Sequence, residues 1–188
     1  MIDWEQTYSR ALSYDDFLQQ HASPGQMQQW SQSLARVQLS DDQQALVQRF
    51  RRKLHVLCMA GAWCGDCIEQ GPILQRVALE SEHIEVRFVD RDADPLLQEA
   101  LLLCGAPRVP QAVFLSEDFA YVGRFGDKTL TQYRELGATT GGAVCSTGLV
   151  PDGIDPIHAG IVQDWLNEFE RAHWIVRLSP RLRQIHGD

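Results

Sequence analysis

The chain has 188 residues, 44% hydrophobic and 22% charged, which suits one domain with its own core and is too short for two full domains. Its mean hydropathy is −0.25, and no apolar run approaches the roughly 18–20 residues of a membrane-spanning helix, so we expect no membrane protein. The formal charge of −8 argues against nucleic-acid binding, which needs lysine and arginine to neutralise phosphates.

The first residues and the cysteine content favour a reducing compartment. The opening segment has neither the basic start nor the apolar run of a secretory leader. Five cysteines are an odd number and too few for a secreted disulfide scaffold. We therefore expect a cytoplasmic protein with no nucleic-acid or membrane partner.

Residues 1–53 are predicted to form an N-terminal helical extension. At Ser23 and Ser40 a serine is followed three residues later by glutamine. This pattern is typical of a helix start, because the two side chains bond backbone N–H groups that the first turn leaves free. Apolar residues, among them Trp30, then recur at helical spacing, which indicates amphipathic helices that must cover a sheet edge or an apolar face.

Beyond the extension the periodicity becomes that of an α/β unit. The apolar run Leu54–Met59 has the length of a buried strand, and a helix is expected from about Cys64 to Leu79. Residues 84–88 alternate between apolar and charged side chains, which predicts a second strand, parallel to the first. Asp94 and the proline after it open a helix that is expected to run to about Leu103.

A hairpin and a long helix complete the predicted order. Residues 112–115 and 120–123 are apolar and separated by a short polar turn, which predicts two antiparallel strands. Asp155 and the following proline open the last strong helix, on which Trp165 and Trp174 are expected to face the core.

The remaining boundaries follow from composition. We expect a main domain at residues 54–176, with a glycine-rich insertion at 126–153 that is either disordered or a functional loop. The insertion contains a candidate short helix at Leu130–Leu136. Residues 177–188 form a basic tail, interpreted as a solvated helix end.

The motif with the clearest chemistry is Trp63-Cys64-Gly65-Asp66-Cys67, which follows the first strand and opens the next helix. The Cys64 sulfur is therefore expected at a helix N-terminus, where free N–H groups and the helix dipole lower a thiol pKa below about 8.5. Cys67 lies one turn further on, close enough to form a disulfide. In such a pair one sulfur attacks a substrate disulfide and the other resolves the mixed disulfide.

Two other interpretations of the cysteine pair stay open, a structural metal site and unreactive core thiols. A zinc site needs four ligands, usually from a second C-x-x-C or nearby histidines, whereas the other cysteines here are single and the histidines scattered. We therefore expect no metal and no bound organic cofactor. The metal alternative would use Cys58, Cys64, Cys67 and Cys104.

The sequence resembles the thioredoxin family. The resemblance rests on the Trp63–Cys67 motif, on Pro72 five residues after it, and on Val109-Pro110 ahead of an apolar strand. It covers roughly residues 54–126 and the last helix. It implies a thioredoxin-like α/β fold, with a central mixed sheet of about four strands flanked by helices. The helical extension would replace the first strand and helix of that fold, and Pro72 would kink the active-site helix.

The resemblance also implies a role for each matching residue. Cys64 would be the exposed nucleophile and Cys67 the buried resolving thiol. Trp63 would pack beside them and belong to the contact surface for substrates. Pro110 would be a cis-proline that faces the disulfide, and Val109 would offer its backbone to an extended substrate segment.

Several positions depart from the family pattern. Asp66 stands where thioredoxins usually have proline. Cys58, expected to be a small buried core residue, occupies the place of the buried aspartate that manages the proton of the resolving cysteine. Phe88 takes the place of its lysine partner, so the usual proton relay is absent. Arg108 is either an ordinary surface arginine or a cation that lowers the pKa of the nucleophile or binds a substrate carboxylate.

These inferences favour a thiol–disulfide oxidoreductase that reduces a protein or small-molecule disulfide through Cys64 and Cys67, with electrons from a reductase or a low-molecular-weight thiol. The alternative is a redox-inactive thioredoxin-fold adaptor, with the extension and the 126–153 segment as contact surfaces. Of the other cysteines, Cys104 is expected to pack at a helix end and Cys145 to be exposed.

Overall fold

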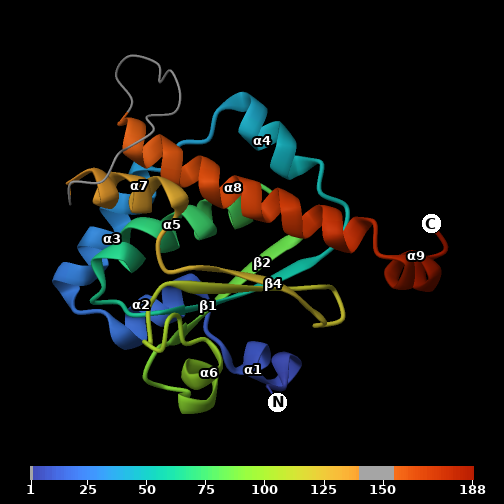
Figure 1. Cartoon of the computed structure of the whole chain (residues 1–188), viewed down its shortest axis with the longest axis horizontal. Coiled ribbons are helices and arrows are strands. Elements are labelled where there is room, and N and C mark those ends of the chain that lie inside the picture. Colours follow the sequence, from blue (N-terminus) through green and yellow to red (C-terminus); the bar gives the residue numbers. More distant parts are fainter. Residues whose placement is uncertain (1, 140–154) are drawn as a thin grey trace.

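The structure is a computed structural model that describes residues 2–139 and 155–188. Four helices precede the first strand, and a sheet covered by further helices follows (Figure 1). The strands are β1 (Leu54–Ala60), β2 (Ile84–Asp90), β3 (Gln111–Leu115) and β4 (Tyr121–Gly126). The helices are α1 (Trp4–Arg10), α2 (Tyr14–His21), α3 (Pro24–Arg36), α4 (Asp41–Gln48), α5 (Gly65–Leu79), α6 (Pro95–Ala100), α7 (Leu130–Thr139), α8 (Pro156–Arg177) and α9 (Pro180–His186).

The four strands form one mixed sheet in the order β2-β1-β3-β4. β1 is parallel to β2 and antiparallel to β3, and β3 is antiparallel to β4. Every residue of the central strand β1 is buried, which explains why its sequence is a continuous apolar run, whereas the edge strand β2 alternates. Helices α5 and α8 lie on one side of the sheet and α6 on the other (Figure 1). The predicted fold class is confirmed.

The segment that joins α1 to α2, together with α2, covers the edge of the sheet at β2. Leu12 and Phe88 exchange two backbone hydrogen bonds, of 2.7 and 2.8 Å, which pair the edge strand with the segment between α1 and α2. The Phe88 ring then packs against Tyr14, Phe17 and Trp30 of the extension. Both predicted helix starts are confirmed, because the serine–glutamine pairs that open α3 and α4 make reciprocal capping bonds.

Two expectations for single residues are wrong. Cys104 is exposed and does not pack at a helix end. Helix α6 already ends at Ala100, because Leu103 and Ala106 exchange backbone hydrogen bonds in the turn that follows, in which Cys104 has a φ of 52°. Trp174 is 51% exposed and donates to Glu170. It lies nine residues after the buried Trp165, or two and a half helical turns, and therefore faces the opposite side of α8.

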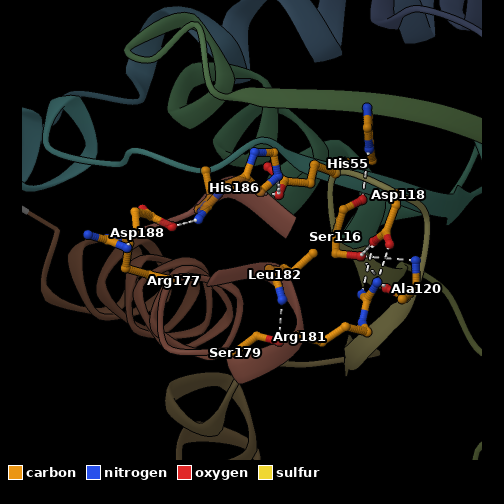
Figure 2. A network of polar contacts seen from close by, with 12 residues as sticks. His55, Ser116, Asp118, Ala120, Arg177, Ser179, Arg181, Leu182, His186 and Asp188 are labelled. Atoms are coloured by element: carbon orange, nitrogen blue, oxygen red, sulfur yellow. Dashed lines mark hydrogen bonds and ion pairs between the residues drawn. The ribbon is translucent and has the colours of Figure 1, made fainter. Parts of the chain in front are cut away.

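The predicted short helix within the insertion is α7, and residues 140–153 of the insertion, Cys145 included, lie outside the described part of the chain. The basic tail is not simply solvated, because it folds into α9 and docks on the turn between β3 and β4 (Figure 2). Arg181 pairs with Asp118, and the buried Arg52 pairs with Glu117 and Asp188. No helix within residues 2–139 and 155–188 is long and apolar enough to cross a membrane.

Candidate active site

A tight turn carries the chain from β1 into α5. The amide of Cys64 donates to the carbonyl oxygen of Gly61 at 3.0 Å, which closes the turn. A Cβ at Gly61 would lie 2.7 Å from the Trp63 indole, so a larger residue there would displace that side chain. Cys64 is the N-cap of α5 and has an extended backbone, which confirms the predicted place of its sulfur at the helix N-terminus.

The two thiols of the motif differ in burial and pKa. Cys64 is half-buried and Cys67 is fully buried. A hydrogen bond from the Cys67 thiol is the largest influence on Cys64 and lowers its pKa to about 6. The backbone N–H groups of Cys67 and Asp66 act in the same direction, against burial and the Asp66 charge. Burial raises the pKa of Cys67 well above its usual value.

The loop before β3 lies against the half-buried thiol. The peptide bond between Val109 and Pro110 is cis, as the resemblance implied. The Cys64 thiol donates to the carbonyl oxygen of Val109 at 3.7 Å. The structure thus brings the cysteine pair and the Val109-Pro110 motif together, although they are far apart in the sequence.

An arginine that the sequence analysis did not identify lies beside the motif. The Trp63 side chain is 51% exposed, and the guanidinium of Arg91 lies 4.7 Å from the centre of its ring. Arg91 follows β2, and its amide donates to the carbonyl oxygen of Ala60 at the end of β1. Neighbouring parallel strands end at the same sheet edge, so the order of the strands was the signal that could have placed it there.

Arg108 forms an ion pair with Asp127. Its side chain is 55% exposed, and its guanidinium pairs at 3.5 Å with the buried carboxylate of Asp127. The largest influences on the Cys64 pKa come from Cys67, burial and Asp66. A direct effect of Arg108 on the nucleophile therefore finds no support in this geometry.

A family model described as thioredoxin matches residues 11–132. The chain belongs to the thioredoxin family. The match includes α2, α3 and α4, so this thioredoxin domain extends through most of the helical segment that precedes β1.

Two solved structures share this fold over the whole chain. A protein of unknown function from Pseudomonas aeruginosa has a TM-score of 0.63 and 18% identity, with 100% of this chain and 99% of that chain covered. An HIV epitope-scaffold has a TM-score of 0.62 at 18% identity, with the same coverage. The comparison with curated proteins returned no match. At this identity the likeness shows the thioredoxin fold alone.

The structure shows how Cys58 and Phe88, which depart from the thioredoxin pattern, lie in the sheet. Cys58 is fully buried in β1, faces no solvent, and pairs in register with Phe88 of β2. Burial raises the pKa of the Cys58 thiol far above its ordinary range. The protonated thiol of Cys58 thus stands where the thioredoxin pattern has a carboxylate, and the apolar ring of Phe88 stands where that pattern has an ammonium group.

The helical extension supports the active-site turn directly. Trp30 of α3 is fully buried, and its indole Nε1 donates to the carbonyl oxygen of Ala62 at 3.0 Å. Its ring lies against Gly71 of α5, where an added Cβ would come within 2.3 Å of it. Gly71 precedes Pro72, which is buried inside the continuous helix α5. The sequence showed both Trp30 and the motif but gave no sign that they are in contact.

The acidic residue between the two cysteines has a partner of its own. The carboxylate of Asp66 forms an ion pair with the ammonium group of Lys128, from the loop that follows β4. The sequence analysis did not identify Lys128. Among the residues that the structure describes, no three His, Cys, Asp or Glu side chains are grouped so that they could hold a metal ion.

Proposed function

We propose that the protein is a thiol–disulfide oxidoreductase that acts on protein or small-molecule disulfides through Cys64 and Cys67. The observation that carries the proposal is the contrast between the two facing thiols. The half-buried Cys64 has a pKa of about 6, and the pKa of the buried Cys67 is raised. Such a pair separates the roles of nucleophile and resolving thiol, because only a thiolate attacks a disulfide.

The reaction proceeds by two exchanges. The Cys64 thiolate attacks one sulfur of the substrate disulfide, the substrate S–S bond breaks, and the departing sulfur takes a proton. Cys67 then loses its proton and attacks the Cys64 sulfur of the mixed disulfide. The second substrate thiol departs, and the Cys64–Cys67 disulfide remains. The substrate has gained two electrons and two protons, and a reductase or a low-molecular-weight thiol returns them to the protein.

A redox titration with site mapping tests the proposal. The protein is equilibrated across a series of dithiothreitol redox ratios, alkylated and mapped by mass spectrometry. We expect a reversible Cys64–Cys67 disulfide with a two-electron midpoint between about −320 and −200 mV, the cytoplasmic range. Cys104→Ser, which removes an exposed cysteine outside the motif, should leave the midpoint unchanged. A pair that never closes would end the oxidoreductase proposal.

Resolving chemistry is tested separately. Cys67→Ser leaves the nucleophile in place and is expected to accumulate the mixed disulfide on Cys64, whereas Cys64→Ser should form none. Equal trapping by both variants would contradict the assigned roles.

The replacement of the buried charged pair by Cys58 and Phe88 favours a second candidate, a redox-inactive adaptor. An adaptor would keep its partner when both Cys64 and Cys67 are replaced by serine, whereas an oxidoreductase would lose its mixed-disulfide complexes. Co-purification of the double variant with its partners separates the two functions.

A further inference from the structure

The loop after β4 is fixed against the cis-proline. A Cβ at Gly126, the last residue of β4, would lie 2.1 Å from the carbonyl oxygen of Pro110, so only glycine allows this close approach. Gly126 also has a φ of +136°, a conformation that residues with a side chain rarely adopt. The next residues, Asp127 and Lys128, therefore begin at a defined position beside the Val109-Pro110 loop.

Asp127 holds this loop in place. Its side chain is 4% exposed, and its carboxylate accepts hydrogen bonds from the Tyr133 hydroxyl at 2.5 Å and from the Lys128 amide at 2.9 Å. Its carbonyl oxygen accepts from the Gln70 side chain of α5 at 2.9 Å. The backbone of Lys128 is thus tied both to α7 and to the helix that carries the cysteine pair.

The Lys128 side chain reaches from this loop to the first turn of α5. Its ammonium group contacts the carboxylate of Asp66, with side-chain exposures of 23% and 31%. The side-chain amide of Gln132 donates to the Asp66 carboxylate at 3.4 Å and to the Glu69 carboxylate at 3.0 Å, which adds a second contact between α7 and the same turn. A pair this sheltered is screened less by solvent and salt than a fully exposed one.

The position of Asp66 gives this ion pair a chemical consequence. An aspartate between the two cysteines places a negative charge beside the sulfur that must carry one, and that charge opposes the Cys64 thiolate. The ammonium group of Lys128 brings the opposite charge to the same carboxylate. The Lys128 charge therefore offsets part of the Asp66 charge close to the sulfur.

We propose that Lys128 is a positioning residue for the dithiol, which holds the Asp66 carboxylate and offsets its charge, so that this charge opposes the Cys64 thiolate less. The inference rests on the proposed oxidoreductase function and deepens it. It assigns electrostatic control of the thiols to a surface pair at the N-terminus of α5, whereas the buried positions behind the thiols hold Cys58 and Phe88.

The test measures the pH dependence of Cys64 alkylation, mapped by mass spectrometry, in a cycle of charge-removing variants. Lys128→Met should lower the thiolate population at pH 5 about three-fold, because the Asp66 charge is then unopposed. Asp66→Asn should raise it by a similar factor. The double variant should return close to the wild-type value, and Lys128→Arg should keep it, because the guanidinium retains the charge.

The matched control is Lys53→Met, which breaks an ion pair with Glu85 at the other end of β1 and should leave the titration unchanged. At pH 8, where the reduced Cys64 is ionised, the midpoint potential of Lys128→Met should become more negative by about 15 mV, the equivalent of a three-fold change.

An unchanged thiolate population in Lys128→Met, or a double variant that stays as far from wild type as that single variant, would overturn the inference. If Lys128→Met does not fold, Asp66→Asn decides alone, and an unchanged titration in it overturns the inference. The alkylation assay needs no disulfide exchange. A pair that fails to close in the redox titration would therefore refute the proposed function without deciding the role of Lys128.

Discussion

Replacing Gly71 by alanine is expected to destabilise the protein, although the same change at an open helix position is stabilising by about 1 kcal/mol. The new Cβ would lie 2.3 and 2.6 Å from two atoms of the six-membered ring of Trp30. Carbon atoms in contact are normally about 3.5–4.0 Å apart, so the ring or the helix must retreat by more than about 1 Å.

The surroundings of Trp30 decide the magnitude. The ring is fully buried, packs against Tyr14, Phe17 and Phe88, and is held by its bond to Ala62. Overpacking costs about 1–3 kcal/mol, and loss of a buried hydrogen bond costs a similar amount. After subtraction of the gain in helix propensity, we expect a net loss of about 3 kcal/mol in the free energy of unfolding.

Urea denaturation of the reduced protein measures this loss. Gly25→Ala is the control, because an added Cβ there meets no atom within 4 Å. Trp30→Phe supplies the second arm, since phenylalanine lacks the outer ring atoms that the new Cβ would strike. In that background the cost of Gly71→Ala should shrink by at least about 1 kcal/mol. A Gly71→Ala variant as stable as Gly25→Ala would refute the reasoning.

Three further predictions concern the thiol and the tail. Below pH 6 the alkylation rate of Cys64 should rise tenfold per pH unit and then level off above its pKa of about 6; a rate still climbing at pH 8 would contradict this. Because that pKa is lower in the folded chain than the usual value of about 8.5, the reduced protein should gain stability from this thiol as pH rises from 6 towards 8.5 and lose it as pH falls through 6. Cys64→Ser should remove this gain, so parallel stability–pH curves for the variant and the wild type would argue against it. In urea, Arg52→Met should cost about 2–3 kcal/mol, because Arg52 is buried between two carboxylates, whereas Arg181→Met at an exposed ion pair should cost clearly less; equal losses would count against this distinction.

The features that the sequence predicted are local ones. Helix starts at Ser23 and Ser40, the buried strand from Leu54, and the place of Cys64 at the start of a helix each depend on side chains within a few residues. Helix capping, hydrophobic periodicity and turn formation all act over that range, so residues close together in the sequence are enough to predict these features.

The features that it did not predict join distant segments. Trp30 and Ala62, Trp63 and Arg91, and Asp66 and Lys128 are brought together by the order of the strands and by the docking of α3 and α7. No periodicity marks such pairs. The end of α6 was missed for a different reason, because backbone bonds in the following turn compete with an apolar run that could have continued the helix.

The hydrogen bond from Trp30 to Ala62 joins the helices before β1 to the turn that carries the thiols, so a change at Trp30 can act on both stability and midpoint potential. Oxidation and unfolding connect the same four states, and the free energies around a closed cycle sum to zero. Any change in midpoint potential caused by Trp30→Phe must therefore equal the difference between the stability that this change removes from the oxidised protein and from the reduced protein. A redox titration and a calorimetric comparison of the oxidised and reduced proteins would then measure the same coupling free energy. A residue of α3 that touches neither sulfur can thus shift the midpoint potential of the dithiol.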